Sequence, residues 1–389
     1  MRWRGAAPLL AVALLVVGCS GPTTAAAASP ETGGPLPVLA YYYIWFDHSS
    51  WDRAKVDLPL LGRYSSDDGN VIRQHIRWAK QAGLTGFIVS WKNTPALSRR
   101  LAQLAEIARA EDFKLAIIYQ GLNFERRPLP VDVIAADLDV FADQFAAGGG
   151  GGGDGVFSLF ERPLVIWSGT WEFSRDDITK ITTQRRQRLL ILASERNVAG
   201  YQRVADVVDG NAYYWSSVNP ETFRGYDAKL ASLGRAVHDR GGLWIAPAAP
   251  GFDGRLIGGT QIVERKAGQT LRRQMDAAVK SSPDAIGVIS WNEFSENTHV
   301  EPSATFGRSY LDVLRDVLGA APPTIPDFDS SEPGDADPTQ LGYGLPVIGA
   351  FVALTVLAQL MIVRRSRQPK PAQNTPDRAP TRDPAQWRP

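Results

Sequence analysis

Eight short apolar segments recur along the chain, and most of them are separated by segments with helical periodicity. The apolar segments are rich in β-branched and aromatic residues and end at polar residues, glycine or proline, which is typical of strands buried on both faces. We expect strands at residues 36–43, 86–91, 114–119, 163–167, 189–193, within 205–215, at 243–247 and at 286–291. We expect helices at residues 68–82, 95–110, 131–147, 175–184, 220–239, 267–280 and 306–318. Strands alternating with helices in this way predict an α/β fold, a single (β/α)₈ TIM barrel over residues 35–320.

An open, doubly wound α/β sheet is the alternative arrangement of the same elements. Dinucleotide-binding sheets of that type carry Gly-x-Gly-x-x-Gly after the first strand. No such motif follows residues 36–43. The glycine run at residues 148–153 also lacks the Gly-Lys-Ser/Thr of a phosphate-binding loop, and we interpret it as a flexible loop. The barrel is therefore the preferred prediction.

The N-terminus has the pattern of an export signal. In residues 1–19, basic Arg2 and Arg4 precede an apolar stretch, as in a secretory signal peptide. The residues before Cys19 resemble a bacterial lipobox, which would make this cysteine a lipidated N-terminus. An ordinary signal-peptidase site at residues 25–28 is the alternative. Cys19 is also the only cysteine, so the chain forms no internal disulfide.

The C-terminus has the pattern of a membrane anchor. Residues 341–363 are apolar and uncharged, and at about 1.5 Å per residue they are long enough to span a bilayer as a helix. The basic residues that follow should stay in the cytoplasm. We therefore expect a single-pass protein of the cell membrane with its barrel on the extracytoplasmic side. Residues 20–34 would be a linker, 321–340 an acidic, proline-rich stalk, and 364–389 a basic, proline-rich cytoplasmic tail.

Composition argues against several classes of function. The net charge is +1, and no arginine-rich stripe suggests nucleic acid as a partner. The four histidines show no metal-ligand spacing, so we expect neither a metal site nor a cofactor. The Gly-x-Ser-x-Gly motif of many serine hydrolases is absent from the sequence.

Two carboxylates follow the last predicted strand. Glu293 and Glu296 come directly after residues 286–291, without the helical periodicity that would mark them as a solvated helix face. The active site of a TIM barrel lies at the carboxyl ends of its strands. A pair of carboxylates on either side of one bond is the minimal machinery for glycoside hydrolysis. We therefore predict that Glu293 and Glu296 are catalytic.

Aromatic residues gather at the other predicted strand ends, among eleven tryptophans and eleven tyrosines in the chain. Flat aromatic faces suit the C–H bonds of sugars, while acids and amides bind the hydroxyls; packing of the core would explain some of these residues equally well. The predicted substrate-binding residues are Tyr43, Trp45, Asp47, Trp91, Tyr119, Trp167, Tyr214, Trp215, Asp253, Asn292, His299 and Glu301.

Three segments, at residues 58–93, 250–257 and 290–302, resemble glycoside hydrolase family 99, the endo-α-mannosidase and endo-α-mannanase family. The resemblance extends over residues 38–318, and family 71 shares parts of the pattern. It implies a glycoside hydrolase acting on an α-linked glycan such as an α-mannoside, and the patterns at the two ends of the chain predict that this enzyme is membrane-anchored. The alternative is a carbohydrate-binding or cell-envelope interaction protein on an inactive barrel, but such a protein would not need both acids.

The catalytic signature of the family resembles Asn-Glu-Trp-His-Glu-Gly-Thr-Gln-Ile-Glu. Aligned with it, the two catalytic acids are Glu293 and Glu296, and Glu301 matches the trailing acid. The resemblance implies a retaining mechanism in which Glu293 deprotonates the 2-hydroxyl of the sugar and Glu296 is the acid/base. This chain departs from the family at Phe294-Ser295, which replaces Trp-His. It also has Asn297 in place of a glycine and Lys92 in place of a second tryptophan after Trp91.

Overall fold

The structure is a computed structural model, and it describes residues 35–146 and 155–321. The predicted signal peptide, linker, glycine loop, membrane anchor and tail lie outside these residues, as does the stalk after its first residue. Among the described residues, no helix is both long enough and apolar enough to cross a bilayer.

Eight parallel strands form a closed barrel, which confirms the predicted fold. They are β1 (Val38–Tyr43), β2 (Gly86–Trp91), β3 (Lys114–Gln120), β4 (Leu164–Ser168), β5 (Leu190–Ala193), β6 (Gly210–Ala212), β7 (Leu243–Ala248) and β10 (Ala285–Val288). Around the barrel the order is β1-β10-β7-β6-β5-β4-β3-β2, so the first strand pairs with the last. The short strands β8 (Phe252–Asp253) and β9 (Ile262–Val263) form a separate antiparallel pair in the connection after β7.

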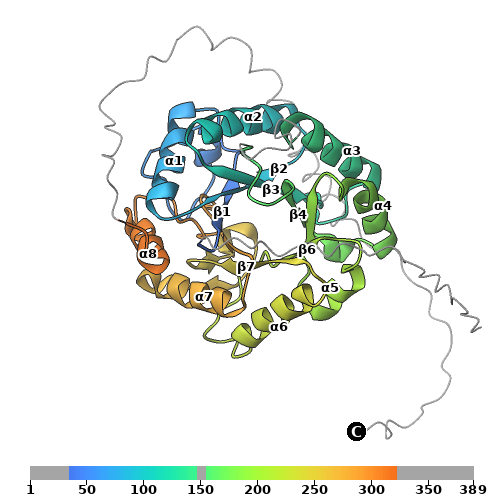
Figure 1. Cartoon of the computed structure of the whole chain (residues 1–389). Coiled ribbons are helices and arrows are strands. Elements are labelled where there is room, and N and C mark those ends of the chain that lie inside the picture. Colours follow the sequence, from blue (N-terminus) through green and yellow to red (C-terminus); the bar gives the residue numbers. More distant parts are fainter. Residues whose placement is uncertain (1–34, 147–154, 322–389) are drawn as a thin grey trace, which may run out of the picture. The chain divides into compact units, whose positions relative to one another are not determined.

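Helices form a ring around the strands (Figure 1). They are α1 (Gly69–Gln81), α2 (Pro95–Ala110), α3 (Val131–Phe141), α4 (Arg175–Arg185), α5 (Val198–Val204), α6 (Tyr226–His238), α7 (Gln269–Lys280) and α8 (Ser309–Leu318). The short 3₁₀ helices are η1 (His48–Asp52), η3 (Thr170–Glu172), η4 (Arg255–Ile257) and η5 (Lys266–Gly268), and the π-helical turn η2 (Ala142–Ala146) continues α3. All the expected helices are present, and α5 is additional.

Capping residues explain why some boundaries agree with the sequence. The carboxylate of Asp68 accepts hydrogen bonds from the backbone N–H groups of Asn70 and Val71 and so begins α1. Thr94 caps α2 in the same way, and Pro95 occupies the first turn, where its missing N–H costs nothing.

Side chains alternate between two buried layers along each strand. On β1, Leu39 and Tyr41 point into the barrel, whereas Ala40 and Tyr42 pack outward between the strands and the helices. Both layers are apolar, because a parallel barrel inside a ring of helices is covered on both faces.

A third cluster closes the barrel where β1 and β10 end. It contains Tyr43, Phe46, Trp51, Tyr64 and Phe294. These residues join the long connection after β1 to the segment that carries the two predicted catalytic acids, and they support that segment from beneath.

Candidate active site

The two glutamates lie on a loop, residues 289–302, that turns back on itself after β10. The N–H of Trp291 donates to the carbonyl of Tyr41 at 2.7 Å, which continues the pairing with β1. The return of the loop is fixed by a hydrogen bond from Val300 N to the Ser290 carbonyl at 3.0 Å. The hydroxyls of Ser290 and Thr298 lie 2.9 Å apart across the loop. The backbone that carries both acids is therefore rigidly held.

A buried arginine supports this loop from outside. The guanidinium of Arg265 donates to the carbonyls of Asn297 at 3.2 Å and His299 at 2.6 Å, and it stacks on the ring of Tyr310 at 3.8 Å. The N–H of Asp253 in β8 donates to the carbonyl of Glu296 at 2.7 Å. The backbone at and just after Glu296 is thus held by two points in the connection between β7 and α7.

Asn292 connects the loop to the first strand. Its side-chain oxygen accepts from Tyr43 N at 2.8 Å, and its amide nitrogen donates to the Tyr43 carbonyl at 3.0 Å. The amide therefore replaces a backbone pairing where β10 has already ended. Because Glu293 follows directly, its distance from β1 is set by this pair of bonds.

The two carboxyl groups have different surroundings. Glu293 is 9% exposed and accepts a hydrogen bond from the N–H of Ser295 at 2.9 Å. Burial raises its pKa, and the bonds from Ser295 and the charge of Lys55 oppose that rise. Burial and the neighbouring charge of Glu293 raise the pKa of Glu296 to about 7, against the opposing charge of Arg126. A proton on Glu296 is thus available near neutral pH, as a general acid requires.

Two tyrosines complete the cluster. The hydroxyls of Tyr43 and Tyr214 are hydrogen-bonded to each other, and the ring of Tyr214 packs 4.6 Å from that of Tyr41 in the barrel interior. Burial raises the pKa of both phenols, and the charges of Glu293 and Glu296 raise it further. Both phenols therefore stay protonated beside the acids. Because one hydroxyl donates to the other, the pair has one O–H left to donate to a substrate oxygen.

Two of the predicted sugar-binding indoles lie at the rim. Trp45 is 40% exposed and stacks on Tyr43 at 4.4 Å. Trp215 is half-buried and lies 6.1 Å from Trp171. The structure thus brings Glu293, Glu296, Tyr43, Tyr214, Trp45 and Trp215 to the carboxyl ends of the strands, as predicted.

Three predicted aromatic contacts lie elsewhere and require correction. Trp91, Tyr119 and Trp167 are 1%, 0% and 0% exposed, in the layer between the strands and the helices. The indoles of Trp91 and Trp167 pack against Phe141 and Phe173, and the hydroxyl of Tyr119 donates to an aspartate of α3. These residues occupy outward positions on their strands, so they are core residues and do not face the mouth of the barrel.

Asn292, His299 and Glu301 are also buried, at 0%, 0% and 2% exposure, and are not placed to contact a glycan. Glu301 accepts hydrogen bonds from the Tyr64 hydroxyl at 2.9 Å and from His75 at 3.1 Å. All three residues therefore support the loop of the glutamates.

The imidazole of His299 belongs to the same support. It stacks on Phe294 at 4.1 Å and lies 3.4 Å from a carboxylate oxygen of Asp57. Burial lowers the pKa of His299 to about 4, so the ring is neutral at neutral pH. It fills the space beneath the loop instead of binding substrate.

Two predicted acidic contacts are engaged by arginines. Asp47 is exposed at the rim but forms an ion pair with Arg100. Asp253 is buried, and its two oxygens accept from Arg255 at 2.9 and 2.6 Å. Both carboxylates order loops at the mouth.

Sequence reasoning missed two cations beside the acids. Lys55 and Arg126 lie close enough to Glu293 and Glu296, respectively, for their charges to lower the pKa of those groups. They come from the connections after β1 and β3. In the sequence, the only feature that points to Lys55 and Arg126 is that each lies in a loop after a strand. Many other residues share this feature, so it does not single them out.

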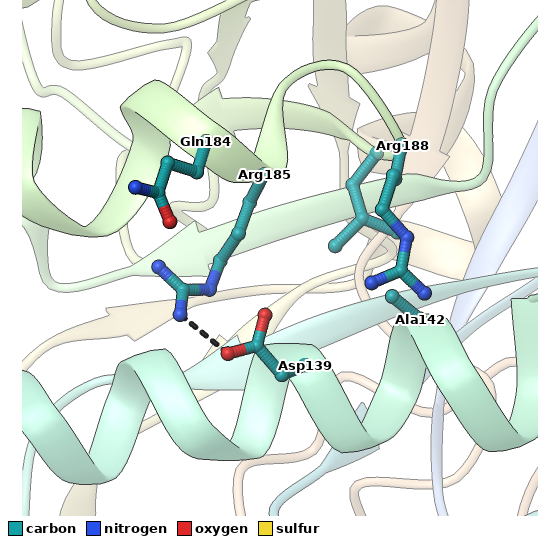
Figure 2. Close-up of a pocket in the computed structure, with 6 residues that line it drawn as sticks. Asp139, Ala142, Gln184, Arg185 and Arg188 are labelled. Atoms are coloured by element: carbon teal, nitrogen blue, oxygen red, sulfur yellow. Dashed lines mark hydrogen bonds and ion pairs between the residues drawn. The ribbon is translucent and has the colours of Figure 1, made fainter.

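A pocket of about 220 Å³ has none of the predicted site residues in its lining (Figure 2). It lies between α3 and the end of α4, where Arg185 pairs with Asp139 at 2.5 Å and Arg188 pairs with Asp143. It is near the amino end of β5, whereas catalysis in such barrels occurs at the carboxyl ends. Within the part of the chain that the structure describes, no group of three or more His, Cys, Asp or Glu could hold a metal ion.

Comparisons with known proteins connect this fold to glycoside hydrolases. No family model and no curated protein sequence matches the chain. The GH99 endo-α-mannosidase from Bacteroides thetaiotaomicron, in complex with bis-tris-propane, is similar with a TM-score of 0.63 at 19% identity, over 73% of this chain and 97% of that one. A second structure of the GH99 endo-α-mannosidase from that organism gives 0.60 at 18% identity, over 72% and 98%.

A structure described as a glycoside hydrolase-like protein is similar with a TM-score of 0.56 at 16% identity, over 77% of this chain and 97% of that one. At these identities the likeness is one of fold. The resemblance to family 99 seen in the sequence is thus confirmed as a similarity of folds, and it covers nearly the full length of the solved structures.

Proposed function

We propose that this protein is a retaining glycoside hydrolase that cleaves an α-linked glycan such as an α-mannoside. The observation that carries the proposal is the pair Glu293 and Glu296 at the carboxyl end of β10, with the pKa of Glu296 raised to about 7. One carboxyl group that can give a proton, beside a second that can take one, is what acid–base cleavage of a glycosidic bond requires.

The sequence resemblance to family 99 supports the assignment of the two roles. Glu293, as a carboxylate, takes the proton of the 2-hydroxyl, and the resulting oxygen attacks C1 to form an epoxide-like ring. The C1–leaving oxygen bond breaks, and Glu296 gives its proton to that oxygen. Glu296 then takes a proton from water as the water attacks C1. The ring opens, and the 2-oxygen recovers its proton from Glu293.

The surrounding side chains fit this sequence of proton transfers. The Tyr43–Tyr214 pair can stabilise negative charge on the 2-oxygen as it develops, because both phenols are protonated and the hydroxyl that accepts from its neighbour is left to donate. The exposed indole of Trp45 offers a flat face for a neighbouring sugar ring.

The test is to incubate the full chain with a panel of α-linked glycans and to follow new reducing ends. Glu296→Gln should lose activity on a natural glycan by about 10²–10⁴-fold but keep more on an aryl glycoside or glycosyl fluoride, whose leaving groups need less protonation. Glu293→Gln should lose activity on both kinds of substrate. Glu106→Gln, an exposed acid on α2, is the control and should behave like the parent.

Two results would count against the proposal. Either variant could retain the parental rate on a substrate that the parent cleaves, which would remove the acids from the mechanism. Alternatively, the chain could bind glycans without cleaving any of them, which would favour the carbohydrate-binding function on an inactive barrel.

We also propose that the chain is anchored in the cell membrane by residues 341–363, with the barrel on the extracytoplasmic side. The sequence pattern at both ends supports this proposal. Protease added to intact cells should remove the barrel and leave residues 364–389 protected, and Cys19→Ser should abolish labelling with a lipid precursor. A barrel that stays protected in intact cells would contradict the orientation, and unchanged labelling would contradict lipidation at Cys19.

A further inference from the structure

A cationic and aromatic corner lies at the carboxyl ends of β4, β5 and β6. We call it the Arg196 corner and define it by Trp171, Arg196, Tyr213, Trp215 and Lys229. The guanidinium of Arg196 lies over the indole of Trp171 at 4.0 Å and over that of Trp215 at 4.7 Å. The two indoles meet at 70°, so the guanidinium sits in the angle between them. This contact fixes the orientation of a side chain that is otherwise exposed.

Neither cation of the corner has a carboxylate partner among the described residues. The adjacent acid, Glu195, is buried and already pairs with Arg203 at 3.0 Å. The arginines of the pocket between α3 and α4 are different, because each of them is neutralised by an aspartate. The hydrogen-bonding edge of the Arg196 guanidinium is therefore left for a ligand or for water.

Lys229 adds a second positive charge to the corner. It is half-buried, and its ammonium donates to the hydroxyl of Tyr213 at 2.7 Å and lies 4.6 Å from the centre of that ring. Burial lowers the pKa of Lys229, and the charge of Arg196 lowers it further. Two like charges held this close repel each other, and a bound anion would relieve that repulsion.

The corner lies at the same end of the barrel as the candidate active site, because its residues follow β4, β5 and β6 or lie in the first turn of α6. Tyr214 stands between Tyr213 and Trp215 in the chain, and its hydroxyl bonds to that of Tyr43 beside the two glutamates. Tyr214 packs toward the barrel interior, whereas Tyr213 and Trp215 pack in the outer layer, so the corner lies one layer outward from the glutamates at the same mouth of the barrel. A further sugar of an extended glycan can be placed there. Lys55 and Arg126 add two further cations near Glu293 and Glu296.

We propose that the Arg196 corner is a subsite for an anionic sugar, so that the preferred substrate is an acidic glycan. This inference rests on the proposed function and extends it to the class of substrate. The guanidinium, held in place by two indoles, can form two parallel hydrogen bonds to a carboxylate, sulfate or phosphate group, and Lys229 supplies a third donor. The edges of the indoles supply apolar contact for the sugar ring that carries the anion.

The test measures binding to one polymer in four forms. The probes are a neutral α-mannan and the same mannan after oxidation of its primary hydroxyls to uronates, after partial sulfation and after partial phosphorylation. The full chain carries Glu296→Gln so that no probe is cleaved, and affinities are measured by calorimetry at low and high salt. Arg196→Gln is compared with Arg235→Gln, which removes an exposed arginine at the far end of the helix that carries Lys229.

At least one acidic form should bind about ten- to a hundredfold more tightly than the neutral mannan, as expected for charge-assisted hydrogen bonds. The form that does so identifies the anion. Arg196→Gln should remove most of the preference and Arg235→Gln none of it. Because part of the attraction is electrostatic and exposed, salt should also reduce it.

The inference would be overturned if neutral and acidic forms bound equally, if no form bound, or if Arg196→Gln kept the preference. Cleavage is then scored separately with the chain that has Glu296. If the chain cleaves neutral mannan and Arg196→Gln does not change the rate, the acidic subsite is refuted and the proposed hydrolase activity is supported. If an acidic form binds, Arg196→Gln weakens that binding, and no probe is cleaved, then the proposed hydrolase activity is refuted and the subsite is supported.

Discussion

Replacing Glu296 by glutamine should stabilise the protein at alkaline pH while it removes the proposed acid. The pKa of Glu296 is raised from 4.5 to about 7, because the folded state buries the carboxylate beside Glu293. Below pH 4.5 the group is protonated in both the folded and the unfolded state, and it costs nothing. Above pH 7 it is ionised in both, and the full cost of burying the charge is present. The free energy of unfolding of the parent should therefore fall, through this group, as pH rises from 4.5 to 7.

The magnitude follows from the size of the change in pKa. At about 1.36 kcal/mol per pKa unit, the upper value is about 3 kcal/mol. Because the side chain is only partly enclosed, solvent screening reduces our expectation to about 2 kcal/mol. A neutral glutamine of the same shape does not carry this cost, so Glu296→Gln should gain about that much stability at pH 8 and almost none at pH 4.5.

The assay is urea denaturation of the parent and the variant at several values of pH, with the difference in the free energy of unfolding plotted against pH. Glu106→Gln, on the exposed face of α2, should show a difference near zero throughout. A difference for Glu296→Gln that does not change with pH, or that grows toward acidic pH, would refute the argument. Such a result would mean that the carboxyl group is well solvated or paired with a cation in the folded state.

Three further results are expected. Glu293→Gln should lower the pKa of Glu296, because it removes the negative charge that helps to raise that pKa. Carboxyl ¹³C NMR of Glu296 measures this shift. An unchanged pKa would show that the two carboxyl groups are too far apart to interact. Glu301→Leu should lower the free energy of unfolding by about 3–5 kcal/mol in urea denaturation, and Glu301→Gln by less, because the leucine leaves two buried hydrogen-bond partners unsatisfied; equal stability of the two variants would contradict this role. Trp167→Ala should lower the free energy of unfolding by about 3–5 kcal/mol and have little effect on the KM for glycans, because this indole is buried in the core. Trp45→Ala should have little effect on stability and raise KM, because this indole is exposed at the rim. The reverse pattern would show that the two indoles had been assigned to the wrong layers.

Much of the fold could be predicted from the sequence, because local signals and burial agree over most of the chain. The predicted and observed bounds of α2 are both 95–110, since Thr94 and Pro95 mark its start. The seven residues of α5 include Gly200 and are too few to show a helical period, so that helix was missed. The strand expected within residues 205–215 is observed at Gly210–Ala212, and one further bond, from Tyr213 N to the Ile245 carbonyl, continues its pairing with β7.

The site was predicted in part, for a reason that lies in strand geometry. The end of β10 could be recognised because an apolar run stops at acidic residues. The side of the sheet on which an aromatic residue falls could not be recognised, because inward and outward positions of a covered barrel are equally apolar. Trp91 is the last residue of β2, as expected, yet it points outward while Ser90 points inward. Because side chains alternate along a strand, an error of one residue in the alignment of a strand assigns its inward side chains to the outer layer and its outward side chains to the interior.

The bond between Asn292 and Tyr43 joins residues 249 positions apart, and that between Glu301 and Tyr64 joins residues 237 apart. Both depend on contact between the first and the last strands, so the candidate site is assembled only when the barrel is closed. Contacts between residues so far apart in the chain form late and slowly. A partly folded or truncated chain that lacks either end strand would hold Glu293 and Glu296 on an unsupported loop, so the proposed active site would be absent until the last strand is in place.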